Sequence, residues 1–199
     1  MARDRADEDN RRLAAVDSLT GVANRRAVIA ALDRDVARSI RTHEPMALMM
    51  VDIDHFKNVN DRYGHPAGDK VLCSVVEVLR ERVRSQDLVG RYGGEEFMVL
   101  LPDTTAKGCY LLAQQLCEAV QALRLEHEGQ PIPVTVSIGV YGGRLQPGDH
   151  WDMLISAADR ALYEAKDRGR NRVEVVEALR RPASLVTANS GSETQPALF

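Results

Sequence analysis

The sequence predicts an α/β sandwich in which helices flank a central mixed, largely antiparallel sheet with a ferredoxin-like core. Two observations support this fold class. Segments with apolar residues at helical spacing alternate along the chain with short apolar runs of strand length. Their order contains a strand-helix-strand-strand-helix-strand core. From this order we also expect the helices to pack mainly on one face of the sheet.

The first half of the chain is predicted to contain two long helices and one buried strand. Apolar side chains recur at every fourth position of residues 24–43, which predicts an amphipathic helix that ends before a proline. Residues 46–53 form an almost continuous apolar run and are predicted to be a buried strand. We expect a polar helical turn over residues 54–63 and the second long helix over residues 66–83.

The second half is predicted to begin with a hairpin. Two apolar runs are separated by Gly93 and Gly94, a two-residue link of the kind that favours a tight turn. A glycine after residue 168 favours a helix end there. The predicted elements are strands at 88–92 and 95–101, a helix at 105–125, a strand at 133–140, a helix at 151–168 and a strand at 172–176.

Composition limits the class of protein. The chain has 199 residues, of which 44% are hydrophobic and 28% charged, as is typical of a soluble globular domain with short extensions. A formal net charge of −3 argues against a general polyanion binder, so we expect no nucleic-acid partner. No apolar run approaches the roughly 18 residues of a membrane span, and the N-terminus is too charged for a signal peptide. We therefore expect a cytoplasmic protein with no membrane insertion.

The two ends of the chain differ from its middle. Residues 1–16 are highly charged and are predicted to be a helical connector stub. Residues 17–178 carry the predicted elements and form the expected domain. Residues 179–199 are rich in Pro, Ser, Thr and Asn, which predicts a disordered tail. Because so short a stub cannot contain a sensor, we expect any sensor or regulatory module to be missing from this chain.

Two dense polar clusters begin where apolar strands end. The first starts at Asp52, and the second includes Glu95 and Glu96 directly after the two glycines. If their strands are neighbours, Asp52 and Glu95 converge on an oxygen-rich site that suits Mg²⁺, for which Mn²⁺ can substitute. Taken singly, an acid after a strand is most often a solvated turn residue, and the basic side chains nearby could be solvated helix charges.

In combination, the motifs resemble the GGDEF family of diguanylate cyclases. The resemblance begins with DSLTGVANRR at 17–26, continues through DIDHFKNVNDRYGHPAGD at 52–69 and includes the signature as GGEEF at 93–97. It ends with SIGV at 137–140 and ADRALYEAKDRGRN at 158–171. Glu95 stands where the family name has Asp, but it keeps a carboxylate. We therefore expect no loss of activity from this departure.

The resemblance implies a fold like the palm of nucleotide cyclases and polymerases. It also implies a reaction that joins two GTP molecules into cyclic di-GMP and releases two pyrophosphates, within a two-fold homodimer. Asp52 would bind the metal through its carboxylate, Ile53 through its backbone carbonyl and Glu95 through its side chain. Glu96 would be a third catalytic acid, a candidate for proton removal.

The same resemblance implies residues that bind the substrate. Lys57, Lys166 and Arg170 would neutralise the phosphates, with help from backbone amides at the start of a helix. Asn60 and Asp69 would read the guanine edge. The full implied set is His55, Phe56, Lys57, Asn60, His65, Asp69, Lys166 and Arg170.

A separate pair of residues, Arg84 and Asp87, resembles the inhibitory R-x-x-D motif of the family, which binds the cyclic di-GMP product. An active cyclase is the leading interpretation. The alternative is a non-catalytic module that binds GTP or cyclic di-GMP and regulates a partner. The chain keeps Asp52, Glu95 and Glu96, which favours the enzyme. A polymerase palm is disfavoured by the charge and by the absence of room for other polymerase domains.

Overall fold

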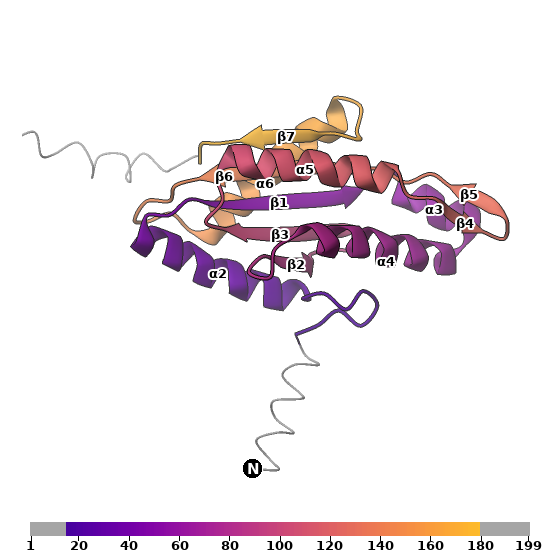
Figure 1. Cartoon of the computed structure of the whole chain (residues 1–199), viewed down its shortest axis with the longest axis horizontal. Helices are drawn as coiled ribbons and strands as arrows, with labels where there is room; N and C mark the ends of the chain where they lie inside the picture. Colours follow the sequence, from indigo (N-terminus) through magenta and orange to yellow (C-terminus); the bar gives the residue numbers. More distant parts are fainter. Residues whose placement is uncertain (1–14, 180–199) are drawn as a thin grey trace, which may run out of the picture.

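A five-stranded mixed sheet lies in the middle of the protein, in a computed structural model that describes residues 15–179 (Figure 1). Its strands are β1 (Met46–Ile53), β2 (Leu88–Arg91), β3 (Glu96–Pro102), β6 (Val136–Gly143) and β7 (Val173–Val176). Their order is β2-β3-β1-β6-β7, and all neighbours are antiparallel except β6 and β7, which run parallel. The order β2-β3-β1-β6 is that of a ferredoxin-like core, so the predicted fold class is confirmed.

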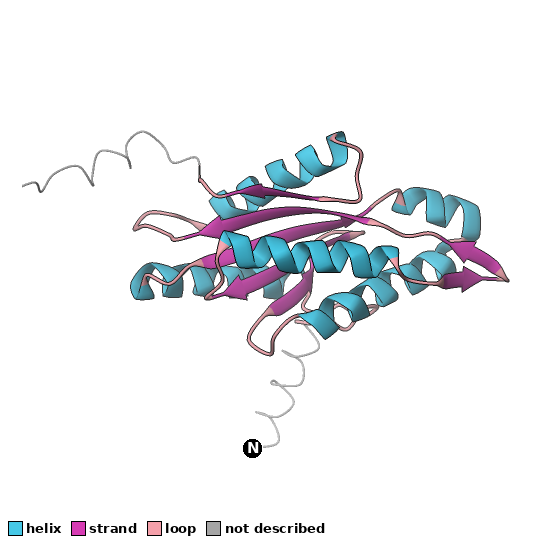
Figure 2. Cartoon of the chain, turned by 45° about the horizontal axis from the view of Figure 1, so that its top comes forward, coloured by secondary structure: helices cyan, strands magenta, loops and turns pink. Residues whose placement is uncertain are grey.

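Helices cover both faces of this sheet, so the expectation that they lie mainly on one face is wrong. Residues of α4 (His65–Arg82) and α5 (Ala106–Gln121) share one hydrophobic core with the sheet, and residues of α2 (Arg25–Thr42) and α6 (Trp151–Asp167) share the other. Figure 2 shows helices in front of the strands and behind them. The physical reason is β1, whose residues are all buried. A strand that is apolar on both faces needs cover on both.

Successive residues of β1 enter opposite cores. Met49 and Val51 pack in the core that contains α4 and α5, whereas Leu48 and Met50 pack in the core that contains α2 and α6. Because side chains alternate along a strand, Asp52 continues the series of Leu48 and Met50. The carboxylate at the end of the strand therefore points toward the layer that contains α6.

A short hairpin between α5 and β6 was not expected. It consists of β4 (Leu125–His127) and β5 (Gln130–Ile132), which pair as a separate two-stranded sheet. Glu128 and Gly129 have φ angles of 50° and 75°, as the two central residues of a type I′ turn require. The predicted helix at 105–125 is therefore too long, because α5 ends at Gln121 and the chain then turns into β4.

The β4–β5 hairpin packs beside the segment that carries most of the predicted substrate residues. The expected polar turn is a regular helix, α3 (Phe56–Tyr63), which leads into α4. The Tyr63 hydroxyl donates a hydrogen bond to the Pro131 carbonyl (3.2 Å), and the Lys70 ammonium donates one to the Glu126 carbonyl (2.7 Å). These bonds tie α3 and α4 to the hairpin.

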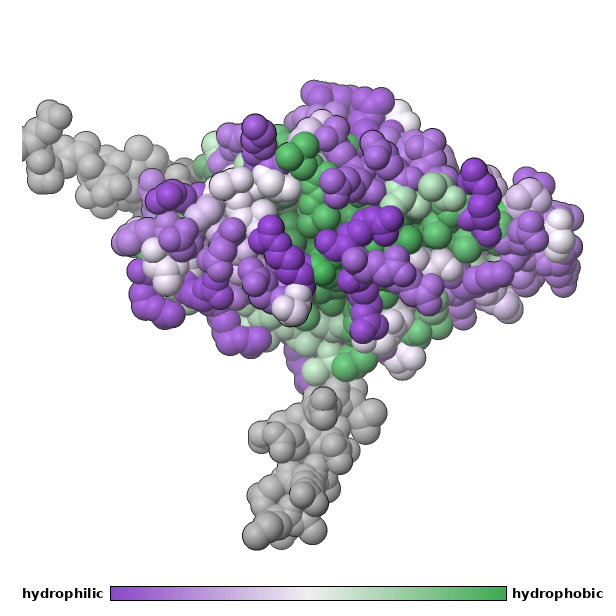
Figure 3. All heavy atoms as spheres, in the orientation of Figure 1, coloured by the Kyte–Doolittle hydropathy of each residue, from purple (hydrophilic) through white to green (hydrophobic). Residues whose placement is uncertain are grey.

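The expected helical connector and the expected disordered tail lie almost entirely outside the described residues. Between these ends, no helix of the described part is both long enough and apolar enough to cross a membrane. Hydrophilic residues cover most of the face seen in Figure 3, and apolar residues gather near its middle.

The contact between α6 and Gly139 of β6 gives a test of the packing. A Cβ at Gly139 would lie 2.8 Å from the Leu162 Cα and closer still to the Ala158 carbonyl oxygen. We expect Gly139→Ala to lower the free energy of unfolding by about 1–3 kcal/mol, because α6 would have to move off the sheet. Denaturant unfolding measures this. Gly108→Ala is the control, since its Cβ would meet Thr105 Oγ1 at an ordinary 3.5 Å, and it should leave stability equal or higher. Equal stability of Gly139→Ala and the parent chain would contradict the packing argument.

Candidate active site

The GGEEF segment forms the turn between β2 and β3. The amides of Tyr92 and Gly93 both donate to the Glu96 carbonyl, at 2.8 and 3.1 Å. The connection between the strands is therefore residues 92–95, and the predicted two-residue link is wrong. A Cβ at Gly93 would meet the Glu96 carboxylate, so a larger residue here would displace that side chain. The turn thus brings the two glutamates to the end of the sheet where β1 finishes.

Asp52 faces this turn from the end of β1. It pairs in register with Glu96 on β3 and is only 5% exposed. The Lys166 ammonium of α6 lies 2.8 Å from its Oδ2 atom. Burial raises the pKa of Asp52, and the hydrogen bond and charge of Lys166 partly offset that rise. Two residues predicted for different roles, metal binding and phosphate binding, therefore form an ion pair here.

Glu95 and Glu96 share the electrostatic environment of Asp52. Burial is the main cause that raises the pKa of each glutamate, and the negative charge of Asp52 raises it further. The charge of Lys166 acts in the opposite direction on both. The carboxylates predicted as catalytic are therefore close enough to repel one another.

The donor groups of this site fit a divalent cation. The Ile53 amide donates to the Glu95 carbonyl at 3.3 Å, which holds these two predicted metal ligands side by side. Crowded carboxylates that raise one another's pKa are a donor set that a dication would stabilise, and Mg²⁺ uses one or two protein carboxylates with water and phosphate oxygens. Within residues 15–179, no three His, Cys, Asp or Glu side chains converge on one metal position. The protein would therefore supply only part of the coordination shell.

A cleft of about 440 Å³, bordered by Glu95, lies between the turn from β2 to β3 and helices α3 and α4. It brings together most of the predicted substrate residues, including both residues expected to read guanine. Asp69 is exposed in this cleft rather than buried. The lining residues are Phe56, Lys57, Asn60, His65, Asp69, Leu72, Arg91, Gly94 and Glu95.

The remaining predicted substrate residues are His55 at the start of α3 and Lys166 and Arg170 at the end of α6. His55 has a left-handed backbone (φ 56°) at the start of α3, where no side chain caps the helix. At the end of α6, the Arg170 amide donates to the Ala165 carbonyl (3.0 Å), in a Schellman-type C-cap. Arg170 lies close enough for its charge to act on Asp52, whose pKa burial raises. Lys166 and Arg170 are therefore near Asp52, whereas Lys57 lies in the cleft.

Asp54 is a residue of the site that sequence analysis missed. Its carboxylate accepts hydrogen bonds from the hydroxyls of Thr135 and Ser137, both at 2.7 Å, and from the backbone amide of Asn171 at 3.1 Å. It is only 6% exposed. Asp54 thus ties the end of β1 to β6 and to the turn after α6. The sequence offered one signal for Asp54, its position directly after Ile53 in a polar cluster. Its role could not be predicted, because its hydrogen-bond partners lie more than 80 positions away along the chain.

Arg84 and Asp87 lie together in the turn before β2, at a second pocket of about 360 Å³. The Asp87 carboxylate accepts from the Arg84 amide at 2.7 Å, and the Arg84 side chain is exposed. Burial raises the pKa of Asp87, and its Oδ1 atom has no hydrogen-bond partner within the described part of the chain. The predicted pair is therefore brought together at a pocket whose lining is distinct from that of the cleft. Its inhibitory role stays a prediction.

The family model described as the GGDEF domain of diguanylate cyclases matches residues 14–172. The chain belongs to the GGDEF family. The family prediction made from the motifs is thereby confirmed.

Relatives of this GGDEF domain include named cyclases. Diguanylate cyclase DgcP of Pseudomonas aeruginosa is 42% identical over 84% of this chain and 25% of the relative. Diguanylate cyclase DosC of Escherichia coli K12 is 36% identical over 89% of this chain and 38% of the relative. The chain therefore spans between a quarter and two fifths of the length of these two proteins.

Solved structures agree with the fold. The coiled coil and GGDEF domain of DgcB from Caulobacter crescentus, in complex with c-di-GMP, is 33% identical with a TM-score of 0.82, covering 88% of this chain and 93% of that one. The active GGEEF domain of a diguanylate cyclase from Vibrio cholerae is 31% identical with a TM-score of 0.72, covering 81% and 99%. The name of the Vibrio cholerae domain contains GGEEF, the sequence that this chain has at residues 93–97.

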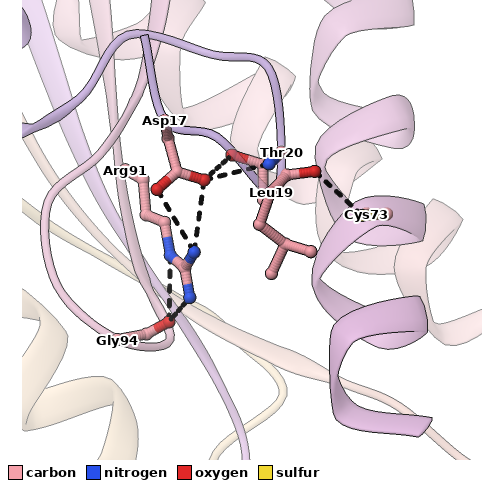
Figure 4. Close-up of polar contacts among 6 residues, drawn as sticks. All are labelled: Asp17, Leu19, Thr20, Cys73, Arg91 and Gly94. Atoms are coloured by element: carbon pink, nitrogen blue, oxygen red, sulfur yellow. Dashed lines mark hydrogen bonds and ion pairs between the residues drawn. The ribbon is translucent and has the colours of Figure 1, made fainter. Parts of the chain in front are cut away.

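In this GGDEF domain, Arg91 connects the N-terminal turn to the signature turn (Figure 4). Its Nε and Nη2 atoms donate to the Gly94 carbonyl at 3.2 and 2.8 Å, and Nη1 donates to both carboxylate oxygens of Asp17 at 3.2 and 3.3 Å. Asp17 also accepts from the Thr20 amide and hydroxyl. Burial opposes the ionisation of Asp17, but these hydrogen bonds and the Arg91 charge outweigh it, so its pKa is lowered. Sequence analysis did not identify this link.

The Arg91 link predicts a local effect on the GGEEF turn. We expect Arg91→Met to destabilise the domain by about 1–2 kcal/mol, since a partly exposed charged donor is lost. Because the Gly94 carbonyl would lose its donor, the amides of Tyr92 and Gly93 should exchange hydrogen for deuterium faster. Arg38→Met is the control, because Arg38 pairs with Asp103 outside the site. Unchanged exchange at both amides in Arg91→Met would show that the turn does not depend on Arg91.

Proposed function

We propose that this chain is the catalytic domain of a diguanylate cyclase. It joins two GTP molecules into cyclic di-GMP, releases two pyrophosphates and depends on Mg²⁺, or on Mn²⁺ in its place. The observation that carries the proposal is the position of Glu95. This residue borders the cleft that contains Asn60 and Asp69, and it also interacts with the charge of Asp52. One nucleotide could therefore place its base in the cleft and its phosphates at the acids.

Base selection would come from α3 and α4. Guanine presents two adjacent N–H donors, which the Asp69 carboxylate can accept, and the Asn60 amide can contact the same edge. Both side chains line the cleft. Adenine lacks this pair of donors, so an adenine base bound over Asp69 would shield the carboxylate from water without replacing its hydrogen-bond partners.

Phosphate binding would come from the cations around the acids. Lys57 in the cleft and Lys166 and Arg170 near Asp52 can neutralise phosphate charge, with Arg170 able to bind two oxygens at once. Asp52, Glu95 and the Ile53 carbonyl would hold the divalent cation. When bound, that cation would polarise the α-phosphate and stabilise the departing pyrophosphate.

In each of two equivalent steps, a ribose 3′-oxygen bonds to the α-phosphorus of the other GTP, and the bond from that phosphorus to the β-phosphate bridge breaks. Glu96, whose pKa burial raises, would accept the 3′-hydroxyl proton. Each cleft holds one nucleotide in this scheme, so two subunits must face one another about a two-fold axis.

Regulation would involve the second pocket and parts outside this chain. The exposed Arg84 side chain can bind phosphate, and Arg84 and Asp87 line the same pocket, so cyclic di-GMP would inhibit there. A sensor or regulatory module would control the domain. This module is the missing partner expected from the sequence.

Incubation with GTP and Mg²⁺, followed by identification of the product by mass spectrometry, tests the proposal. We expect cyclic di-GMP, and at least about a hundredfold less of it from Asp52→Asn or Glu95→Gln, because a bound metal supplies several kcal/mol of transition-state stabilisation. Asp33→Asn, an exposed acid on α2, should keep full activity. Binding of GTP or cyclic di-GMP without product formation would favour the non-catalytic module instead.

Base choice provides an independent test. We expect GTP to be used at least about tenfold better than ATP, which corresponds to about 1.4 kcal/mol of discrimination. Asp69→Ser should narrow this ratio, because it removes both the acceptor for guanine and the unsatisfied acid that penalises adenine. Asp61→Ser, an exposed acid on α3 outside the cleft lining, is the matched control. The measurement is the ratio of cyclic dinucleotides formed from mixed GTP and ATP. An unchanged ratio in Asp69→Ser would exclude Asp69 from base reading.

A further inference from the structure

Lys166 stands among four carboxylates at the site. Its ammonium contacts Asp52 at 2.8 Å. Its positive charge also acts on Glu95, Glu96 and Asp159, where burial raises the pKa of each acid and Lys166 lowers it. Lys166 is therefore the direct counter-ion of Asp52 and a shared counter-ion of its neighbours.

The two partners differ in their freedom to move. The Asp52 side chain is 8% exposed at the end of a fully buried strand, so it is fixed. The Lys166 side chain is 33% exposed and reaches the acid from α6 on a flexible four-carbon stem. If the pair separates, Lys166 is the residue that moves.

The Asp52 carboxylate that Lys166 contacts is also the one that would hold the divalent cation. A dication and an ammonium at one carboxylate repel each other strongly at such distances. Lys166 and the cation therefore compete for Asp52, and departure of the ammonium would strengthen cation binding there. A strongly anionic group near Arg170, such as a triphosphate, would give the ammonium another partner.

We propose that Lys166 is an exchangeable counter-ion, which holds Asp52 until a triphosphate draws it away, so that metal and nucleotide bind cooperatively. The inference rests on the metal site of the proposed function. Thermodynamic linkage requires the coupling to be mutual, with each ligand raising the affinity for the other by the same factor. The acids are thus kept neutralised until the substrate arrives.

The test measures Mn²⁺ binding without nucleotide, from the electron paramagnetic resonance signal of free Mn²⁺. Lys166→Met keeps an apolar stem and removes the ammonium, so it should bind Mn²⁺ at least about fivefold more tightly than the parent chain. Lys166→Gln should also bind more tightly, and its amide can still donate to Asp52 if the methionine variant does not fold. Lys107→Met is the matched control. Lys107 is exposed at the start of α5, which lies against Gly142 at the opposite end of the sheet from Asp52, so the Mn²⁺ affinity of this variant should be unchanged.

Adding Asp52→Asn to Lys166→Met should abolish the tighter binding, which would place it at Asp52. Unchanged or weaker Mn²⁺ affinity in the folded Lys166 variants would overturn the inference, as would equal tightening in Lys107→Met. Product formation from GTP is a separate readout. Mn²⁺ binding that follows these expectations without any cyclic di-GMP would support the counter-ion role and overturn the proposed cyclase activity.

Discussion

A carboxylate held almost out of water at the end of β1 is the constraint on which the site depends. The strand is buried along its whole length, so its last residues cannot relax toward solvent. The charge of Asp52 must therefore be compensated by a cation, and that of Asp54 must be stabilised by hydrogen-bond donors. Lys166 satisfies the first requirement, and β6 with the turn after α6 satisfies the second. The need for positive charge beside the buried Asp52 carboxylate, which Lys166 meets here, is also what would favour binding of a divalent ion at this site.

The turn opposite Asp52 is fixed from several directions. The Glu96 carbonyl closes it, Arg91 holds the Gly94 carbonyl, and the Ile53 amide holds the Glu95 carbonyl. The Arg25 guanidinium also lies 4.6 Å above the Tyr92 ring. Backbone anchoring of this kind leaves the glutamate side chains free to bind while their Cα positions stay constant. Such preorganisation favours catalysis, because little ordering remains to be done when the substrate binds.

Sequence was informative where the signal was local. The buried run at 46–53 and the long helices follow from apolar spacing, and the cleft residues of α3 and α4 lie within one continuous motif. Long-range partners carry no such signal. Arg91 meets Asp17 across 74 positions, and Asp54 meets the Asn171 amide across 117. The strands of the β4–β5 hairpin are only three residues long, too short to show a clear alternation of polar and apolar residues. Cover on both faces of the sheet could have been inferred from β1, which shows no alternation of polar and apolar residues.

The contact of α6 with Gly139 has a kinetic consequence. A helix seated this closely on the sheet is a rigid base for the side chains at its end. Lys166 can then change partners by rotation about its own bonds, which takes picoseconds to nanoseconds in partly exposed side chains, while the backbone stays still. Exchange of this lysine would therefore be far faster than the collective motions that bring subunits or domains together. In the proposed reaction, which needs two subunits, turnover would then be limited by their encounter and not by the movement of Lys166.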